Sequence, residues 1–284
     1  MIRRLIQIMT TLATNSYIKG FYTLSIYQGE GKKLCVPVLN CYSCPGAVAS
    51  CPVGSMQLLL ASVKHQVSLY VVGIVTLVGA LSGRLVCGWL CPFGLFQELT
   101  AKLSRSKFKI PRILSYMKYV ILALTLVLPV LWLDPHGLGA PYFCKLLCPA
   151  GTLEAGLPLG LGNPLLRANL GWLFIWKVSV LVLFVVASII TYRPFCRTTC
   201  PLGAFYGLFN AISLWKLEID HHSCQECGKC SNNCPLDIDV MDNPNSPECV
   251  RCMICKDSCP SGALTFRARL ISMKEEGNDE SIIC

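Results

Sequence analysis

Eight cysteines in the last quarter of the chain form two copies of one spacing. In each copy, three cysteines separated by two residues are followed, after three more residues, by a fourth cysteine and a proline. This pattern is typical of bacterial two-cluster ferredoxins, in which the first three thiolates of a run bind one [4Fe–4S] cube and the fourth binds the other. Paired zinc sites are the alternative, but they do not need this crossed spacing. The sequence predicts one cluster on Cys224, Cys227, Cys230 and Cys259, and a second on Cys249, Cys252, Cys255 and Cys234.

A second cysteine motif occurs twice upstream of these runs. Residues 84–94 and residues 193–203 match at an arginine, two cysteines, a proline and a glycine. Cysteines four residues apart lie on one face of a helical turn, so two such pairs can supply four ligands. We expect Arg84 and Arg193 to offset the negative charge of a cluster there, or to donate hydrogen bonds to its sulfurs. Simple packing cysteines beside basic loop residues are the alternative. The predicted ligands of this inner site are Cys87, Cys91, Cys196 and Cys200.

Further cysteines precede two of the apolar segments. Residues 51–57 match residues 148–154, which makes Cys51 and Cys148 equivalent, and Cys144 lies four residues before Cys148. For the fourth ligand of an outer cluster we favour Cys44 over Cys41. Disulfides within residues 35–51, or a copper site, are the alternatives, because disulfides persist outside the cytoplasm. The predicted outer set is Cys44, Cys51, Cys144 and Cys148.

The composition indicates a membrane protein. Of 284 residues, 53% are hydrophobic and only 14% are charged, and the mean hydropathy is +0.53, which is too apolar for a soluble domain of this size. Residues 1–217 contain 19 Lys or Arg against 4 Asp or Glu, whereas the remaining residues contain 6 against 12. We attribute the basic excess to membrane topology and expect no nucleic-acid partner. The sequence has neither a haem-attachment motif nor a glycine-rich nucleotide loop after a strand.

Four segments are predicted to span the membrane: 5–28, 66–86, 113–133 and 170–191. The loop 87–112 contains five basic residues, which places it, both termini and the ferredoxin domain in the cytoplasm. The expected location is the inner membrane of a prokaryotic cell, with the N-terminal segment retained as an anchor. Residues 95–106 are predicted to form an amphipathic helix at the membrane surface.

Lys19 and Lys177 fall within predicted spans, where a charged side chain is costly and is a functional candidate. Their side chains can face a cluster, a quinone oxygen or a carboxylate. The alternative is that each side chain extends along the helix so that its charged end reaches the membrane surface.

The matched motifs indicate a parallel repeat, whose halves are related by a pseudo-twofold axis along the membrane normal. The predicted fold is an α-helical integral membrane protein with four transmembrane helices, arranged as two parallel hairpin repeats over residues 1–111 and 112–217. A C-terminal α+β two-cluster ferredoxin domain follows at 218–270, with a polar tail at 271–284.

These motifs resemble those of the membrane polyferredoxin family of NapH, MauN and the C-terminal half of NosR, and residues 34–45 are similar to its 4Fe-4S binding members. The resemblance implies that the inner pairs and the ferredoxin cysteines are functional. It also implies electron flow between quinones or cytoplasmic donors and a partner across the membrane, often a flavin-bearing subunit, within a hetero-oligomer. The outer cysteines depart from the NapH pattern.

We therefore expect a membrane iron-sulfur protein that carries electrons between cytoplasmic carriers and the membrane or its outer face, as a subunit of an oxidoreductase complex. A quinol or quinone oxidoreductase subunit with its site near Lys19 or Lys177 is the first alternative. A redox or metal-handling assembly factor, suggested by Cys35, Cys41 and Cys284, is the second. One hop across a hydrocarbon core of about 30 Å is inefficient, so we expect re-entrant cysteine turns or a bridging cofactor.

Overall fold

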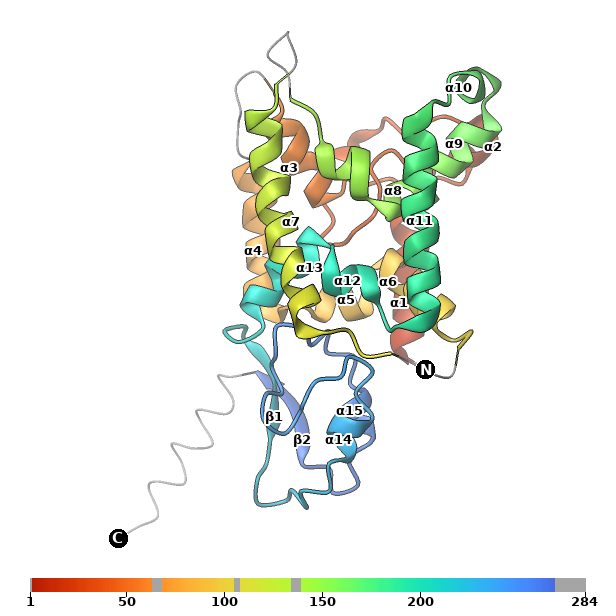
Figure 1. Cartoon of the computed structure of the whole chain (residues 1–284). Coiled ribbons are helices and arrows are strands. Elements are labelled where there is room, and N and C mark those ends of the chain that lie inside the picture. Colours follow the sequence, from red (N-terminus) through yellow and green to blue (C-terminus); the bar gives the residue numbers. More distant parts are fainter. Residues whose placement is uncertain (1, 63–67, 105–107, 134–138, 269–284) are drawn as a thin grey trace.

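The computed structural model describes residues 2–62, 68–104, 108–133 and 139–268. Four helices run along the long axis of the molecule and enclose a set of shorter helices (Figure 1). Two of the four, α7 and α11, are long and apolar enough to cross a membrane, and α4 is a shorter apolar helix. Most side chains of α7 and α11 are not buried, as expected where a helix faces lipid. The four helices are α1 (Ile2–Thr14), α4 (Leu69–Ser82), α7 (Arg112–Leu131) and α11 (Trp172–Ile190).

The first predicted span is not one continuous helix. The helix α1 ends at Thr14, and a short helix, α2 (Lys19–Thr23), follows. Asn15 stops α1 because its side chain donates to Thr11 O (3.1 Å) and to Asn40 Oδ1 (2.9 Å), which ties the chain to a distant loop. Consequently Lys19 lies exposed on α2 rather than inside a spanning helix.

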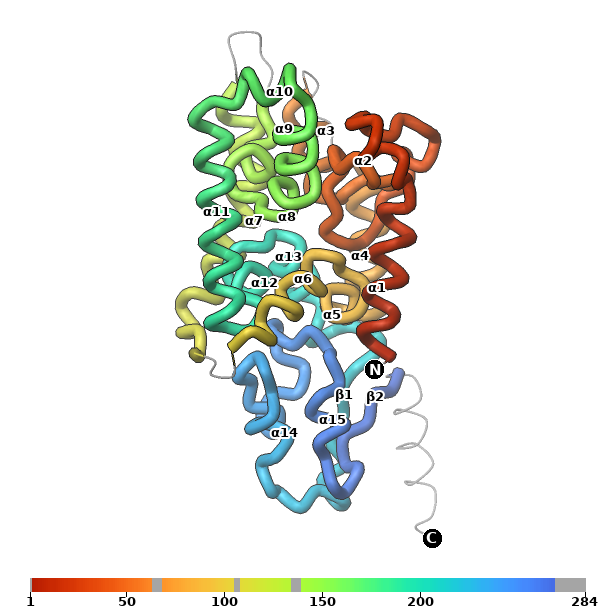
Figure 2. Tube along the Cα trace, turned by 90° about the vertical axis from the view of Figure 1, so that its right-hand side faces the viewer, coloured from red at the N-terminus to blue at the C-terminus, as the bar shows by residue number. Residues whose placement is uncertain are grey.

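Short helices form two layers between the long ones (Figure 2). Four of them begin at the proline of a Cys-Pro-x-Gly sequence, with the cysteine at the N-cap and proline in the first turn, where it is tolerated. The layer nearer the ferredoxin domain contains α5 (Leu85–Trp89), α6 (Pro92–Ala101), α12 (Pro194–Thr198) and α13 (Pro201–Phe209). The other layer contains α3 (Pro52–Leu60), the π-helices η2 (Phe143–Leu147) and η3 (Thr152–Gly156), and α8 (Pro149–Gly151). The helices α9 (Leu157–Gly162) and α10 (Pro164–Ala168) follow η3 in the chain and lie beside α11 in Figure 1. The 3₁₀-helix η1 (Glu30–Lys33) precedes this layer in the chain.

The helix α6 corrects the expectation of a surface helix over 95–106. It begins at Pro92 and ends at Ala101, and seven of its ten residues are buried. It packs against α1 and α11 in the interior of the molecule. Residues 105 and 106 lie outside the described part of the chain.

The C-terminal unit is a small α+β domain. Its strands β1 (Trp215–Ile219) and β2 (Leu264–Ala268) pair antiparallel, with Leu217 opposite Phe266, and two one-turn helices, α14 (Lys229–Asn232) and α15 (Ile254–Asp257), lie beside them. The domain begins at β1, a few residues before the predicted boundary at 218. The predicted tail, 271–284, lies outside the described residues.

Candidate iron-sulfur cluster sites

Two small cavities in the C-terminal domain are each lined by four cysteines. One contains Cys224, Cys227, Cys230 and Cys259. The other contains Cys234, Cys249, Cys252 and Cys255. The fold thus gathers the two crossed sets expected from the spacing.

Two thiols of the second ferredoxin set have raised pKa values because they are buried. Burial raises the pKa of Cys249 to about 11 and that of Cys255 to about 12. Thiolates are the form that binds iron, so cluster loading at neutral pH must release protons from this site.

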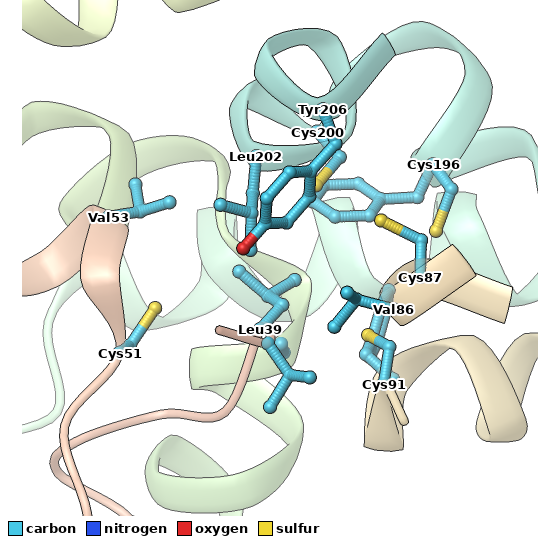
Figure 3. Packing of buried hydrophobic residues seen from close by; sticks show 14 of the residues in the cluster. Leu39, Cys51, Val53, Val86, Cys87, Cys91, Cys196, Cys200, Leu202 and Tyr206 are labelled. Atoms are coloured by element: carbon cyan, nitrogen blue, oxygen red, sulfur yellow. The ribbon is translucent and has the colours of Figure 1, made fainter. Parts of the chain in front are cut away.

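The inner set is buried in one place. Cys87, Cys91, Cys196 and Cys200 each have less than a tenth of their surface exposed, and all belong to one apolar cluster. Their thiols are close enough to interact electrostatically with one another. Figure 3 shows them grouped on one side of Tyr206, with Cys51 on the other side.

Arg84 and Arg193 cross between the two repeats. The Arg84 Nη2 atom donates to Cys196 O (2.9 Å), and the Arg193 Nη1 atom donates to Cys87 O (2.6 Å). Both side chains are completely buried. The two arginines therefore hold the cysteine turn of the opposite repeat through its backbone and place two positive charges beside the site, where an anionic cluster would be stabilised.

Two acidic residues balance these charges. Glu98 pairs with Arg193 (2.7 Å) and Glu248 with Arg84 (3.4 Å). Glu248 also pairs with the buried Lys118 of α7. Because Glu248 directly precedes Cys249, its ion pair with Arg84 links the ferredoxin domain to the inner site.

Gln97 is a site residue that the sequence reasoning missed. Its Nε2 atom donates to Cys196 Sγ (3.1 Å), and its Oε1 atom accepts from the backbone N–H of Phe195 (3.2 Å). It stands six residues after the cysteine of a Cys-Pro-x-Gly sequence. The residues at the same position of the four such sequences are Gln57, Gln97, Glu154 and Tyr206.

The Cys-Pro-x-Gly turns also direct backbone donors at sulfur. Gly203 N lies 3.3 Å from Cys200 Sγ, and Gly151 N lies 3.4 Å from Cys148 Sγ. Each cysteine is in an extended conformation just before its helix, which aims its sulfur at the first free N–H groups. These donors stabilise a negative thiolate.

The outer cysteines surround a larger cavity of about 490 Å³, lined by Cys41, Cys51, Cys144 and Cys148. A Cβ atom built on Gly151 would lie 3.5 Å from Cys41 Sγ and 3.8 Å from Cys148 Sγ, so these two sulfurs face the same point. Cys44 is buried but does not line the cavity. The geometry therefore favours Cys41 over Cys44 as the fourth member of the outer set, the reverse of the choice made from the sequence.

Lys177 lines the same cavity and interacts electrostatically with Cys144. Glu154 accepts a hydrogen bond from Cys41 N (2.7 Å), which fixes the loop that carries this cysteine. Cys144 and Glu154 lie on the π-helices η2 and η3, a distortion that occurs mostly at functional sites. Of the two lysines singled out by the sequence, only Lys177 faces thiols.

The free cysteines of the described residues are available as cluster ligands. The cysteines in the described ranges are all free, Cys35 included, and Cys284 lies outside those ranges. Nor does the described part of the chain contain three or more His, Cys, Asp or Glu side chains gathered around one metal-ion position. In a [4Fe–4S] cube each thiolate binds a different iron, so four cysteines spread around a cavity fit a cube.

The second ferredoxin site is fastened directly onto the inner site. Trp89 Nε1 donates to Arg251 O (2.8 Å), and Asn210 Nδ2 donates to Cys249 O (2.7 Å). Val250 belongs to the same buried cluster as the inner cysteines. The outer cysteines Cys51 and Cys148 belong to that cluster too, so one continuous core joins three of the four cysteine sets.

Comparisons with known proteins support iron-sulfur binding. A family model described as a 4Fe-4S binding domain matches residues 65–111 and 170–219, the two segments that contain the inner pairs. The uncharacterized protein MJ0750 of Methanocaldococcus jannaschii is 33% identical over 203 residues, covering 68% of this chain and 76% of that protein.

Two ferredoxin-type proteins are more distant relatives. NapH of Haemophilus influenzae is 27% identical over 69% of this chain and 66% of its own. The methylamine utilization protein MauN of Paracoccus denitrificans is 28% identical over 55% of this chain and 49% of its own. No solved structure matches the chain significantly.

Proposed function

Because the chain belongs to the NapH- and MauN-like polyferredoxin family, we propose that it is a membrane iron-sulfur protein that transfers electrons through four [4Fe–4S] clusters. The main support for this proposal is that the cysteine sets adjoin one another. A hydrogen bond attaches the second ferredoxin set to the region of the inner set, and one buried core joins the inner and outer sets. Electrons pass along the first ferredoxin, second ferredoxin, inner and outer clusters, in either direction. The ligands are the two crossed ferredoxin sets, the inner set, and Cys41, Cys51, Cys144 and Cys148.

The re-entrant layers account for transfer across the membrane. The short helices α6, α8 and α13, which have Cys91, Cys148 and Cys200 at their N-caps, lie among the long helices (Figure 1). Irregular backbone is tolerated at such depth where protein surrounds it. We propose that α1, α4, α7 and α11 cross the inner membrane of a prokaryotic cell as two parallel repeats, with the basic loop 87–112, both termini and the ferredoxin domain in the cytoplasm.

The partners are redox proteins, such as a flavin-bearing subunit, within a hetero-oligomer. Residues 218–284 contain twice as many acidic as basic residues, 12 against 6, and the cluster thiolates add negative charge. A basic partner surface therefore complements the ferredoxin domain. Turnover with the natural partner that does not change with salt concentration would contradict this interface.

Iron and acid-labile sulfide, measured on the anaerobically purified full-length chain, test the number of clusters. Four cubanes correspond to about sixteen iron atoms per chain. The variant Cys41→Ser is expected to lose the outer cluster, and its matched control Cys44→Ser to keep it, as judged by EPR of the reduced state. About twelve iron atoms in the wild type, or equal iron in the two variants, would contradict the outer site as assigned.

Quinone reduction or quinol oxidation at the outer cavity is a second candidate function. The cavity measures about 490 Å³, whereas each ferredoxin cavity, lined by the same number of cysteines, measures about 20 Å³ or less. The extra space, with Lys177 as a donor, can hold a quinone head group beside a cluster. The test is whether quinone analogues inhibit electron transfer. Inhibition that is lost in Lys177→Leu, but kept in the exposed control Lys19→Leu, would support this function. Electron transfer in the wild type that is insensitive to such analogues would exclude it.

A further inference from the structure

Tyr206 occupies the space between the inner and outer cysteine sets. Its side chain is completely buried in the core that both sets share. Cys87 and Cys91 of the inner set and Cys51 of the outer set belong to the same buried core. Figure 3 shows its ring between these groups, with the hydroxyl on the Cys51 side.

The hydroxyl of Tyr206 completes a bonded route between the two sets. It donates to Pro37 O (2.9 Å), on the loop that reaches Cys41 four residues later. At its other end, Tyr206 lies on α13, six residues after Cys200 at the N-cap of that helix. Covalent bonds and one hydrogen bond thus join an inner ligand to an outer ligand without a gap through space.

Tyr206 also departs from the pseudo-twofold symmetry of the repeats. Its equivalent in the first repeat, Gln97, serves the inner site alone, through Cys196 Sγ. If position 206 only had to donate a hydrogen bond to the inner site, as Gln97 does, a glutamine would be sufficient there. The second repeat instead has an aromatic side chain that reaches the outer loop, and an aromatic ring fills the space between the two sets with polarisable atoms.

We propose that Tyr206 is the bridge through which electrons tunnel between the inner and outer clusters. This inference rests on the proposed four-cluster function. The electron that the inner cluster loses is the one that the outer cluster gains, and the reverse holds for flow in the other direction. The phenol is neither oxidised nor deprotonated, and no further reactant is needed. Tyr206 is therefore a positioning and coupling residue, not a cluster ligand.

Time-resolved reduction of the full-length chain tests the bridge. Photoreduction of the ferredoxin clusters, followed by freeze-quench EPR, gives the rate at which the outer cluster becomes reduced. In Tyr206→Leu we expect this rate to fall by about tenfold or more, because the electronic coupling between the clusters becomes weaker. In Tyr206→Phe, which keeps the ring and loses the hydrogen bond, we expect a smaller decrease. The control is Phe205→Leu, a ring on the same helix that lines a separate apolar cavity.

Iron content and midpoint potentials separate coupling from structure. Both are expected to stay at wild-type values in Tyr206→Phe, so that a slower rate there reports the lost connection alone. Equal rates in Tyr206→Leu, Tyr206→Phe and Phe205→Leu, with all clusters present, would overturn the bridge and leave the proposed function standing. A wild-type chain without an outer cluster would overturn both.

Discussion

Hydrogen bonds to sulfur are one means by which single residues tune a cluster potential. At the inner site, Gln97 donates to Cys196 Sγ over 3.1 Å from a fully buried position. Such a bond favours the reduced cluster, which carries the greater negative charge. In Gln97→Leu we therefore expect the midpoint potential of the inner cluster to fall by on the order of 60 mV, or about 1.4 kcal/mol for one electron.

An EPR-monitored redox titration measures this shift. The matched control is Gln57→Leu, which changes the equivalent glutamine of another Cys-Pro-x-Gly helix, where the structure shows no hydrogen-bond partner for the side chain among the described residues. Equal potentials in wild type and Gln97→Leu, with the cluster present in both, would show that the bond does not act on the cluster.

The sequence predicted which cysteines lie together where their spacing restricts them to one site. The ferredoxin cysteines are of this kind, because each run is one short turn. The hydrogen bond of Gln97 was not predictable, since its acceptor is 99 residues away. The choice between Cys41 and Cys44 also depended on tertiary structure, because Glu154, from the second repeat, holds Cys41 at the cavity.

At the scale of elements, the Cys-Pro-x-Gly helices need their glycines for close packing against the arginine and backbone of the inner site. A Cβ atom on Gly203 would lie 3.1 Å from Cys196 O and 3.2 Å from Arg84 Nη2. In Gly203→Ala we expect Arg84 to be displaced, the free energy of unfolding to fall by roughly 1–3 kcal/mol, and the inner cluster to be lost in part. Iron content and thermal unfolding measure both effects.

The control for this substitution is Gly73→Ala in α4, which makes the same change within a helix where a Cβ would meet nothing within 4 Å. It is expected to keep all iron. Equal iron content and equal stability in the two variants would mean that the tight contact at Gly203 is accommodated without cost.

Hydropathy predicted α7 and α11 but not the interior layers. A run of apolar residues in the sequence shows how long and how apolar a segment is, and both of these helices are long and apolar enough to cross a membrane. The re-entrant segments are short and depend on distant backbone partners, as where Gly139 N donates to Ala61 O (2.9 Å). For the same reason the end of α1 at Thr14, fixed by contacts with the loop around Asn40, could not be read from residues 5–28 alone.

At the scale of the whole molecule, transfer depends on a ferredoxin domain that is fixed to the membrane half. Arg251 is 1% exposed and provides much of this attachment, because its guanidinium donates to Ser82 O (2.8 Å), Asn210 O (3.0 Å) and Ser213 Oγ (2.7 Å). In the proposed four-cluster chain, a domain held at this many points keeps the second ferredoxin cluster at a constant distance from the inner cluster, so that no domain movement is required for each electron.

Loss of the Arg251 side chain should therefore slow transfer between these two clusters. In Arg251→Ala we expect the docked state to lose roughly 1.5–3 kcal/mol, since buried acceptors lose a charged donor. The segment between α13 and β1 should become sensitive to protease, and reduction of the inner cluster by the ferredoxin should slow. The exposed Lys256→Ala on α15 is the control. Arg251 lies between two cysteines, so its loss can also affect cluster binding. The milder Trp89→Phe removes one hydrogen bond of the same interface and shows whether transfer slows while the iron content stays intact. Unchanged transfer in both variants would mean that the attachment does not limit electron flow.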